Sequence, residues 1–132
     1  DYAVDIFYKG LQTGRYESFV SKDTVLPMMY MDDAIRATLE LMDADAEKLS
    51  VWTSYNLTAI SFSVDELAEE VQKHIPELEV TYKPDERQKI ADSWPRSIDD
   101  SVAREDWGWS HEFDVPGMTK EMIMKLKEKF AE

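Results

Sequence analysis

The spacing of apolar residues switches repeatedly along the chain between the period of a helix and the period of a strand. Near the N-terminus they recur every three or four positions, as in a helix with one buried face, at Val4, Phe7, Tyr8 and Leu11. Further along they alternate with polar residues, as in a β-strand, at Leu78, Val80 and Tyr82. A chain that changes period in this way is predicted to be mixed α/β, and neither a helical bundle nor a repeat array.

These patterns place the individual elements. We expect helices over 1–12, 32–45, 63–75, 99–107 and 118–130, and strands over 16–20, 23–31, 51–56 and 78–82. The stretch 85–96 is polar and irregular, so it is predicted to be a loop. The apolar stripe of the second helix is predicted to be its buried face, formed by Ile35, Leu39 and Met42.

Local signals fix several element ends. Ser63 and Glu66 have the spacing of a capping box, and Gly14 and Gly108 are expected to end two helices. Pro27 lacks an N–H for a central ladder, so its strand is predicted at the edge of a sheet. Two acidic pairs, 32–33 and 99–100, stand at predicted helix starts. We interpret them as caps, because adjacent helical residues do not face each other as an acid/base pair would.

Composition restricts the partners. The 15 Lys+Arg and 28 Asp+Glu residues give a net charge of −13, which excludes nucleic acid and an anionic membrane surface as expected partners. The apolar fraction of 43% is enough for a core. There are no cysteines, no glycine-rich phosphate loop and no apolar run long enough to cross a membrane. We expect a soluble protein.

Few residues suggest chemistry by themselves. His74 and His111 have no further ligand at metal spacing, so no metal site is predicted, and Ser93 has no nearby histidine base. Trp94 lies in a polar loop, where it is expected to face a ligand. The cluster of Met28, Met29 and Met31 fits a ligand pocket and ordinary core packing equally well. The residues alone therefore form no complete catalytic set.

Several segments, however, resemble the C-terminal part of extended short-chain dehydrogenase/reductases, which are Rossmann-type, epimerase/dehydratase-like enzymes. They are Asp-Tyr-Ala-Val at 1–4, Leu-Pro-Met-Met-Tyr followed by Asp-Asp within 23–34, the stretch from Ser-Tyr-Asn-Leu to Ser-Phe-Ser at 54–63, Ile-Ala-Asp-Ser-Trp-Pro at 90–95, and the stretch from Asp-Asp-Ser to Trp-Gly-Trp at 99–109. They follow in the family's order and spacing, and together they span the chain. The run at 26–30 is the most specific of them and is similar to the branch that oxidises L-threonine.

The resemblance implies that the cofactor-binding and substrate-binding roles belong to different parts of the enzyme. In this family a glycine-rich loop binds NAD, and a Tyr-x-x-x-Lys pair with a serine deprotonates the hydroxyl group. This chain has none of these groups. We therefore expect residues 1–132 to be a C-terminal substrate-binding portion, with the NAD-binding Rossmann core upstream of it. Two alternatives stay open: a nucleotide-sugar epimerase or dehydratase of the same family, and a non-catalytic acidic interaction module.

The resemblance also implies roles for single residues. Asp1 is expected to position the substrate, and Trp94 to cover its pocket and exclude water. Pro27, Met28 and Met29 are expected to shape the wall beside the threonine methyl group. The reaction implied is the oxidation of L-threonine to 2-amino-3-oxobutanoate with NAD, in a homodimer. We expect a cytoplasmic location, or a mitochondrial one for an animal source.

Overall fold

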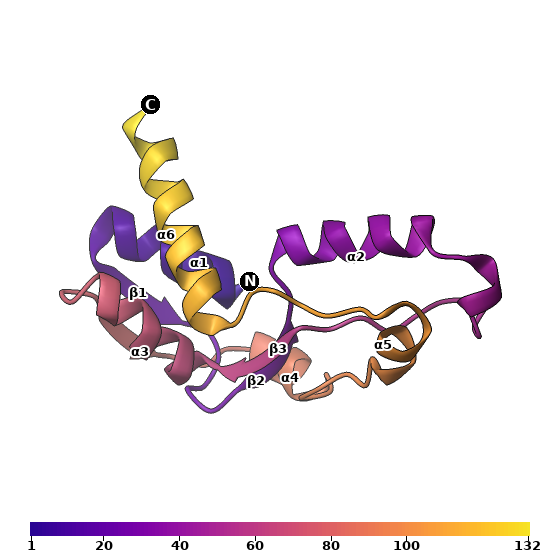
Figure 1. Cartoon of the computed structure of the whole chain (residues 1–132). Coiled ribbons are helices and arrows are strands. Elements are labelled where there is room, and N and C mark those ends of the chain that lie inside the picture. Colours follow the sequence, from indigo (N-terminus) through magenta and orange to yellow (C-terminus); the bar gives the residue numbers. More distant parts are fainter.

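The computed structural model describes all residues, 1–132, and shows a packed lobe from which an arm extends (Figure 1). In the lobe, three helices pack together beside a parallel pair of strands. The helices are α1 (Tyr2–Thr13), α3 (Val64–His74) and α6 (Val115–Ala131), and the strands are β1 (Arg15–Ser18) and β4 (Glu79–Tyr82). Their apolar faces form one core, which includes Phe7, Tyr16, Phe62 and Leu67. The predicted α/β class is therefore confirmed.

A second, antiparallel pair of strands joins the lobe to the arm. It consists of β2 (Val25–Met28) and β3 (Ile60–Ser63), with Pro27 opposite Ser61. Because this sheet has only two strands, each of them has a free edge, and a proline without an N–H is tolerated there. The edge position predicted from Pro27 is confirmed.

The arm is built from α2 (Met31–Asp43), the short 3-10 helix η1 (Ala46–Lys48), α5 (Ser101–Trp107) and the extended segment that follows α5 (Figure 1). It has a small core of its own, formed by Ala37, Ala103 and Trp109. The remaining helix, α4 (Arg87–Asp92), lies between β4 and α5 in the sequence.

The helix ends follow the predicted local signals. The Ser63 hydroxyl accepts the Glu66 N–H at 3.1 Å, and the Glu66 carboxylate accepts the Ser63 N–H at 2.7 Å, which completes the capping box. Gly14 and Gly108 end α1 and α5 with φ of 68° and 76°. Glycine adopts this left-handed conformation without the cost that a Cβ imposes.

Two element predictions are wrong, and one strand is not predicted. Residues 51–56 form no strand, because no strand of this chain lies beside them to complete a hydrogen-bonded ladder. The strand at 60–63 was not expected, since its short pattern runs directly into the capping box of α3. The stretch 85–96 is not wholly irregular, because it contains α4.

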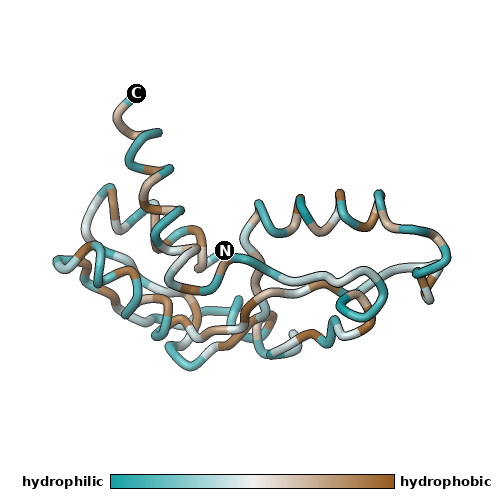
Figure 2. The backbone as a smooth tube through the Cα atoms, viewed as in Figure 1, coloured by the Kyte–Doolittle hydropathy of each residue, from teal (hydrophilic) through white to brown (hydrophobic).

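The predicted burial of the α2 stripe is also wrong. Ile35, Leu39 and Met42 are 54%, 55% and 75% exposed, whereas the buried residues of this helix are Asp33 and Ala37. Figure 2 shows hydrophobic positions along α2, and no element of this chain covers that face. The helical period is thus correct, but α2 packs its opposite face, with Ala37, against the rest of the arm.

Candidate functional site

A cavity of about 390 Å³ brings together four of the predicted site residues. They are Asp1, Pro27, Met28 and Trp94. The other lining residues are apolar or aromatic except for Arg87: Tyr2, Phe19, Val20, Leu26, Ile90 and Ala91. The cavity therefore lies where the start of α1, strand β2 and helix α4 meet. A small apolar cavity with few polar groups is the usual form of a site for a small molecule.

A larger cleft, of about 800 Å³, lies between α2 and α5. Charged side chains dominate its lining and include Arg36, Glu40, Asp43, Lys48 and Asp106. It contains none of the predicted site residues, and most of its lining residues are polar or charged. We therefore take the smaller cavity as the candidate site.

Asp1 is held at the mouth of helix α1. Its Oδ1 accepts the Ala3 N–H at 2.9 Å, so the side chain serves as the N-cap. Its other oxygen, Oδ2, makes no hydrogen bond within the chain. One carboxylate oxygen thus fixes the group, and the second is free to accept a hydrogen bond from a ligand.

Helix α4 places the aromatic wall. The Ser21 N–H donates to Gln88 Oε1 at 2.7 Å, which ties α4 to the connection between β1 and β2. After the helix, the Trp94 N–H donates to the Ala91 carbonyl at 3.1 Å, closing one further turn. Trp94 is 60% exposed, so its indole can cover a ligand in the cavity.

Arg87 is the one basic residue of the cavity. Its Nη2 donates to Asp85 Oδ2 at 2.6 Å, and its guanidinium lies over the Phe19 ring, 3.6 Å from the centroid. Hydrogen bonds from Arg87 hold the pKa of the Asp85 carboxyl below its ordinary value. Both members of this ion pair are therefore charged near neutral pH, and one of them lines the cavity.

Apart from the Asp1 carboxylate, the cavity contains no group placed to accept a proton from a substrate. Burial raises the pKa of Tyr2 to about 12, so its phenol is neutral near pH 7. The Ser93 hydroxyl donates to the Ile90 carbonyl at 2.7 Å, as expected of a residue at a helix end rather than a nucleophile. These residues can bind, orient and shield a ligand.

The methionines separate. Met28 lines the cavity, whereas Met29 packs against the arm core of Ala37, Ala103 and Trp109. Met31 is 65% exposed at the start of α2. Met28 therefore fits both interpretations of the cluster, because it also packs against the lobe core, whereas Met29 fits core packing and Met31 fits neither.

Sequence reasoning missed Arg87, Phe19 and Ile90. Ile90 and Trp94 are four residues apart, the spacing of two side chains on one face of a helix, and this was the only available signal. Phe19 and Arg87 are 68 positions apart in the numbering (87 − 19), so only the fold brings them together.

The residues of this chain do not fit NAD. A dinucleotide site needs a glycine-rich turn between a strand and a helix. Gly14 instead follows a helix and precedes a strand, and none of the four glycines lies in such a turn. No three acidic, histidine or cysteine residues are grouped to hold a metal ion. No helix has the length and apolar character needed to cross a membrane.

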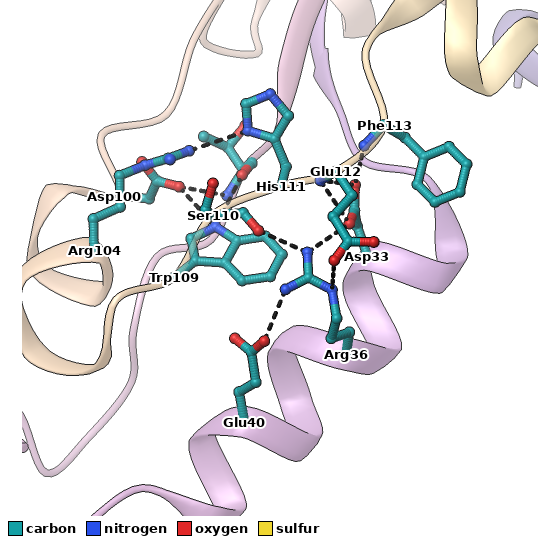
Figure 3. A network of polar contacts seen from close by, with 11 residues as sticks. Asp33, Arg36, Glu40, Asp100, Arg104, Trp109, Ser110, His111, Glu112 and Phe113 are labelled. Carbon is teal, nitrogen blue, oxygen red and sulfur yellow. Dashed lines mark hydrogen bonds and ion pairs between the residues drawn. The ribbon is translucent and has the colours of Figure 1, made fainter.

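Two aspartates hold the arm together (Figure 3). Asp33 is 1% exposed, and its Oδ2 accepts the N–H groups of Glu112 and Phe113 at 3.2 and 3.0 Å. Arg36 Nη2 donates to Asp33 Oδ1 at 2.9 Å and to the Ser110 carbonyl at 2.6 Å. Asp33 therefore connects α2 to a distant segment and is no helix cap. Tyr30 occupies the cap position.

Asp100 plays a similar part at α5. Its Oδ2 accepts the Trp109 indole N–H at 3.1 Å and the Thr58 N–H at 3.3 Å, and its Oδ1 accepts Arg104 Nε at 2.8 Å (Figure 3). It stands at the N-cap position but makes no capping hydrogen bond, whereas the neighbouring Asp99 accepts the Ser101 N–H at 3.0 Å. The interpretation of the acidic pairs as caps is thus wrong for Asp32, Asp33 and Asp100, and of these four residues only Asp99 accepts an N–H group at a helix start.

Comparison with known proteins supplies the context that this geometry lacks. No protein-family model matches the chain. A protein of Bos taurus named "L-threonine 3-dehydrogenase, mitochondrial" is 57% identical over 124 residues, covering 93% of this chain and 33% of the relative. A protein of Staphylococcus haemolyticus named an uncharacterized epimerase/dehydratase is 47% identical over 130 residues, covering 98% of this chain and 41% of the relative.

The fold is also similar to that of a solved structure. The crystal structure of L-threonine dehydrogenase from Phytophthora infestans matches with a TM-score of 0.93 and 50% identity, covering 96% of this chain and 41% of that one. The chain thus spans between a third and two fifths of the length of the curated relatives it matches.

Proposed function

We propose that the chain is the C-terminal, substrate-binding portion of an extended short-chain dehydrogenase/reductase of the L-threonine 3-dehydrogenase type, because its sequence and fold are similar to those of enzymes with that name. The reaction would be the oxidation of L-threonine to 2-amino-3-oxobutanoate with NAD. The cavity between α1, β2 and α4 carries the proposal, because it gathers Asp1, Pro27, Met28 and Trp94 around a small apolar space.

Each residue has a role suited to its position. The free carboxylate oxygen of Asp1 accepts a hydrogen bond from the ammonium group of the substrate, and Trp94 covers the pocket and excludes water. Pro27 and Met28 line the side of the pocket that takes the methyl group. Met29 has no place in this role, because its side chain packs in the arm.

The rest of the reaction belongs to the upstream Rossmann portion. NAD and the tyrosine, lysine and serine of the family's catalytic set would come from there, since this chain has neither a fitting nucleotide turn nor a Tyr-x-x-x-Lys pair. Hydride transfer needs cofactor, base and substrate held together, so this chain alone is expected to be inactive. We further propose a homodimer. Its location would be the cytoplasm, or the mitochondrion, as in the name of the bovine relative.

A nucleotide-sugar epimerase or dehydratase is the second candidate, favoured by the name of the staphylococcal relative. A sugar diphosphate carries two phosphate groups, for which several converging Arg or Lys side chains would be expected. The cavity offers Arg87 alone, and the chain carries a net charge of −13. The smaller amino acid fits these observations better.

The decisive experiment uses the full-length protein, assayed with L-threonine and NAD and, in parallel, with UDP-sugars. We expect NADH formation with threonine. In Trp94→Ala, KM for threonine should rise about tenfold, the effect of losing one well-packed contact, while KM for NAD stays unchanged. Trp52→Ala, which removes a 79% exposed tryptophan outside the cavity, is the matched control.

The Asp1 role needs a second variant. Asp1→Asn keeps a good helix cap but removes the charge, so turnover of threonine should fall while the fold is retained. Asp99→Asn is the control, because Asp99 also accepts the N–H two residues further on, at 3.0 Å. Sugar turnover without threonine oxidation would overturn the proposal, and unchanged threonine kinetics in both site variants would remove these residues from the site.

A further inference from the structure

The candidate cavity contains one acidic and one basic side chain in otherwise apolar surroundings. Asp1 comes from the start of α1, and Arg87 from the start of α4. We propose that Arg87 binds the carboxylate of the substrate, so that Asp1 and Arg87 together select a zwitterionic amino acid. This inference rests on the proposed function and deepens it, because it names the group that recognises the acid end of the substrate.

The guanidinium is held in a fixed plane. It lies over the Phe19 ring at 3.6 Å from the centroid, and Asp85 accepts its Nε at 3.0 Å and its Nη2 at 2.6 Å. A flat aromatic contact on one side and a two-point ion pair along one edge leave the group little freedom. Arg87 is thus oriented before a ligand arrives.

Part of the guanidinium remains available. Asp85 takes hydrogen bonds from Nε and Nη2, and Nη1 makes none within the chain. The side chain is 53% exposed and lines the cavity, so a ligand can reach it. A carboxylate is the natural acceptor for the free N–H groups, because arginine pairs with planar anions through parallel hydrogen bonds.

The charge of the protein makes such a group necessary. A chain with a net charge of −13 repels an anion, and the apolar walls of the cavity make an unpaired carboxylate costly to bury. No other Lys or Arg lines the cavity. Recognition of a substrate carboxylate by the side chains of this cavity therefore depends on Arg87.

The test compares two substrates in the full-length protein. L-Threonine and L-threoninamide share the hydroxyl, the methyl and the ammonium, but only the first has a carboxylate. Arg87→Met should lower kcat/KM for threonine about tenfold to a hundredfold, the usual effect of losing a hydrogen bond to a charged group. In this variant kcat/KM for the amide should stay within about twofold of the wild-type value. Arg87→Lys keeps the charge but not the planar guanidinium with its parallel N–H donors, so its kcat/KM for threonine should lie between the values of wild type and Arg87→Met.

Controls separate the possible failures. Arg15→Met removes an exposed arginine that pairs with Glu79 at 3.2 Å outside the cavity, and it should change neither value. If Arg87→Met lowers kcat/KM equally for both substrates, the role of Arg87 is structural and the inference is overturned. The inference is also overturned if the variant keeps the wild-type ratio of kcat/KM for threonine to kcat/KM for the amide. If Arg87→Met does not fold, the inference is overturned when Arg87→Lys keeps the wild-type ratio of kcat/KM for threonine to kcat/KM for the amide. A wild-type enzyme that oxidises neither substrate overturns the proposed function, and this inference with it.

Discussion

At the scale of single residues, Asp33 and Asp100 stabilise the arm through the same kind of contact. Burial by itself would raise the pKa of Asp33, but the N–H groups of Phe113 and Glu112 and the Arg36 guanidinium outweigh it, and the pKa lies below its ordinary value. For Asp100, burial is likewise outweighed, chiefly by Arg104, and its pKa is also lowered. Each charged carboxylate thus binds backbone segments that are far apart in the sequence.

The Asp33 contact predicts a pH-dependent arm. Asp33→Asn removes the charge in nearly the same shape, and we expect a loss of about 2 kcal/mol, or roughly thirtyfold faster amide exchange at Glu112 and Phe113 at pH 7. Because the folded pKa is lowered, the native contribution of Asp33 is complete above its ordinary pKa of 3.8. It is lost as the pH falls below that value towards the folded pKa. The exchange ratio of variant to wild type should therefore narrow towards one as pH drops from 7 to 3.

A neighbouring residue provides the control. Asp32 is half-exposed and pairs with Lys125 at 3.2 Å. Since exposed ion pairs contribute little, Asp32→Asn should leave exchange at Glu112 and Phe113 near wild type. Equal acceleration in both variants would mean that the charge of the helix start, and not the buried contact of Asp33, holds the arm.

At the scale of elements, the sequence predicts the parts whose cause is local. The capping box at Ser63, the glycine stops and the edge strand at Pro27 follow from residues within a few positions of each other. The strand expected over 51–56 fails for the opposite reason, because a strand needs a partner that sequence alone does not place. The cavity combines both cases: Trp94 stands out in its loop, whereas the fold is needed to bring Arg87 against Phe19.

The capping box gives a prediction for α3. Ser63→Ala removes the acceptor of the Glu66 N–H, and we expect the free energy of unfolding to fall by about 1 kcal/mol, measured by urea denaturation of the full-length protein. Ser61→Ala, an exposed position in the same strand, is the control and should change stability by less than about 0.5 kcal/mol. A smaller effect at Ser63 than at Ser61 would contradict a stabilising role for the cap.

At the scale of the whole molecule, the chain has more surface than a compact protein of its mass. Its solvent-accessible area is 8299 Å², against roughly 7200 Å² expected for a folded monomer of this size. Part of the excess is apolar and lies on α2, where Ile35, Leu39 and Met42 are each more than half exposed. Exposed apolar faces of this kind mark surfaces that another element covers. The upstream Rossmann portion of the proposed enzyme is our candidate.

This surface yields a prediction in which one substitution has opposite consequences in two contexts. In the isolated 132-residue chain, where Leu39 is 55% exposed, Leu39→Glu should be harmless and should reduce binding of an apolar dye. In the full-length protein the same change would bury a charge at the covered face and should lower the melting temperature by several degrees. Met124→Glu, on α6, where the methionine is 46% exposed, should have little effect in either form.

The isolated chain should also melt without a sharp cooperative transition, because its apolar faces lack their cover. A sharp melt of the monomer, with Leu39→Glu neutral in both forms, would show that α2 faces solvent in the whole enzyme too.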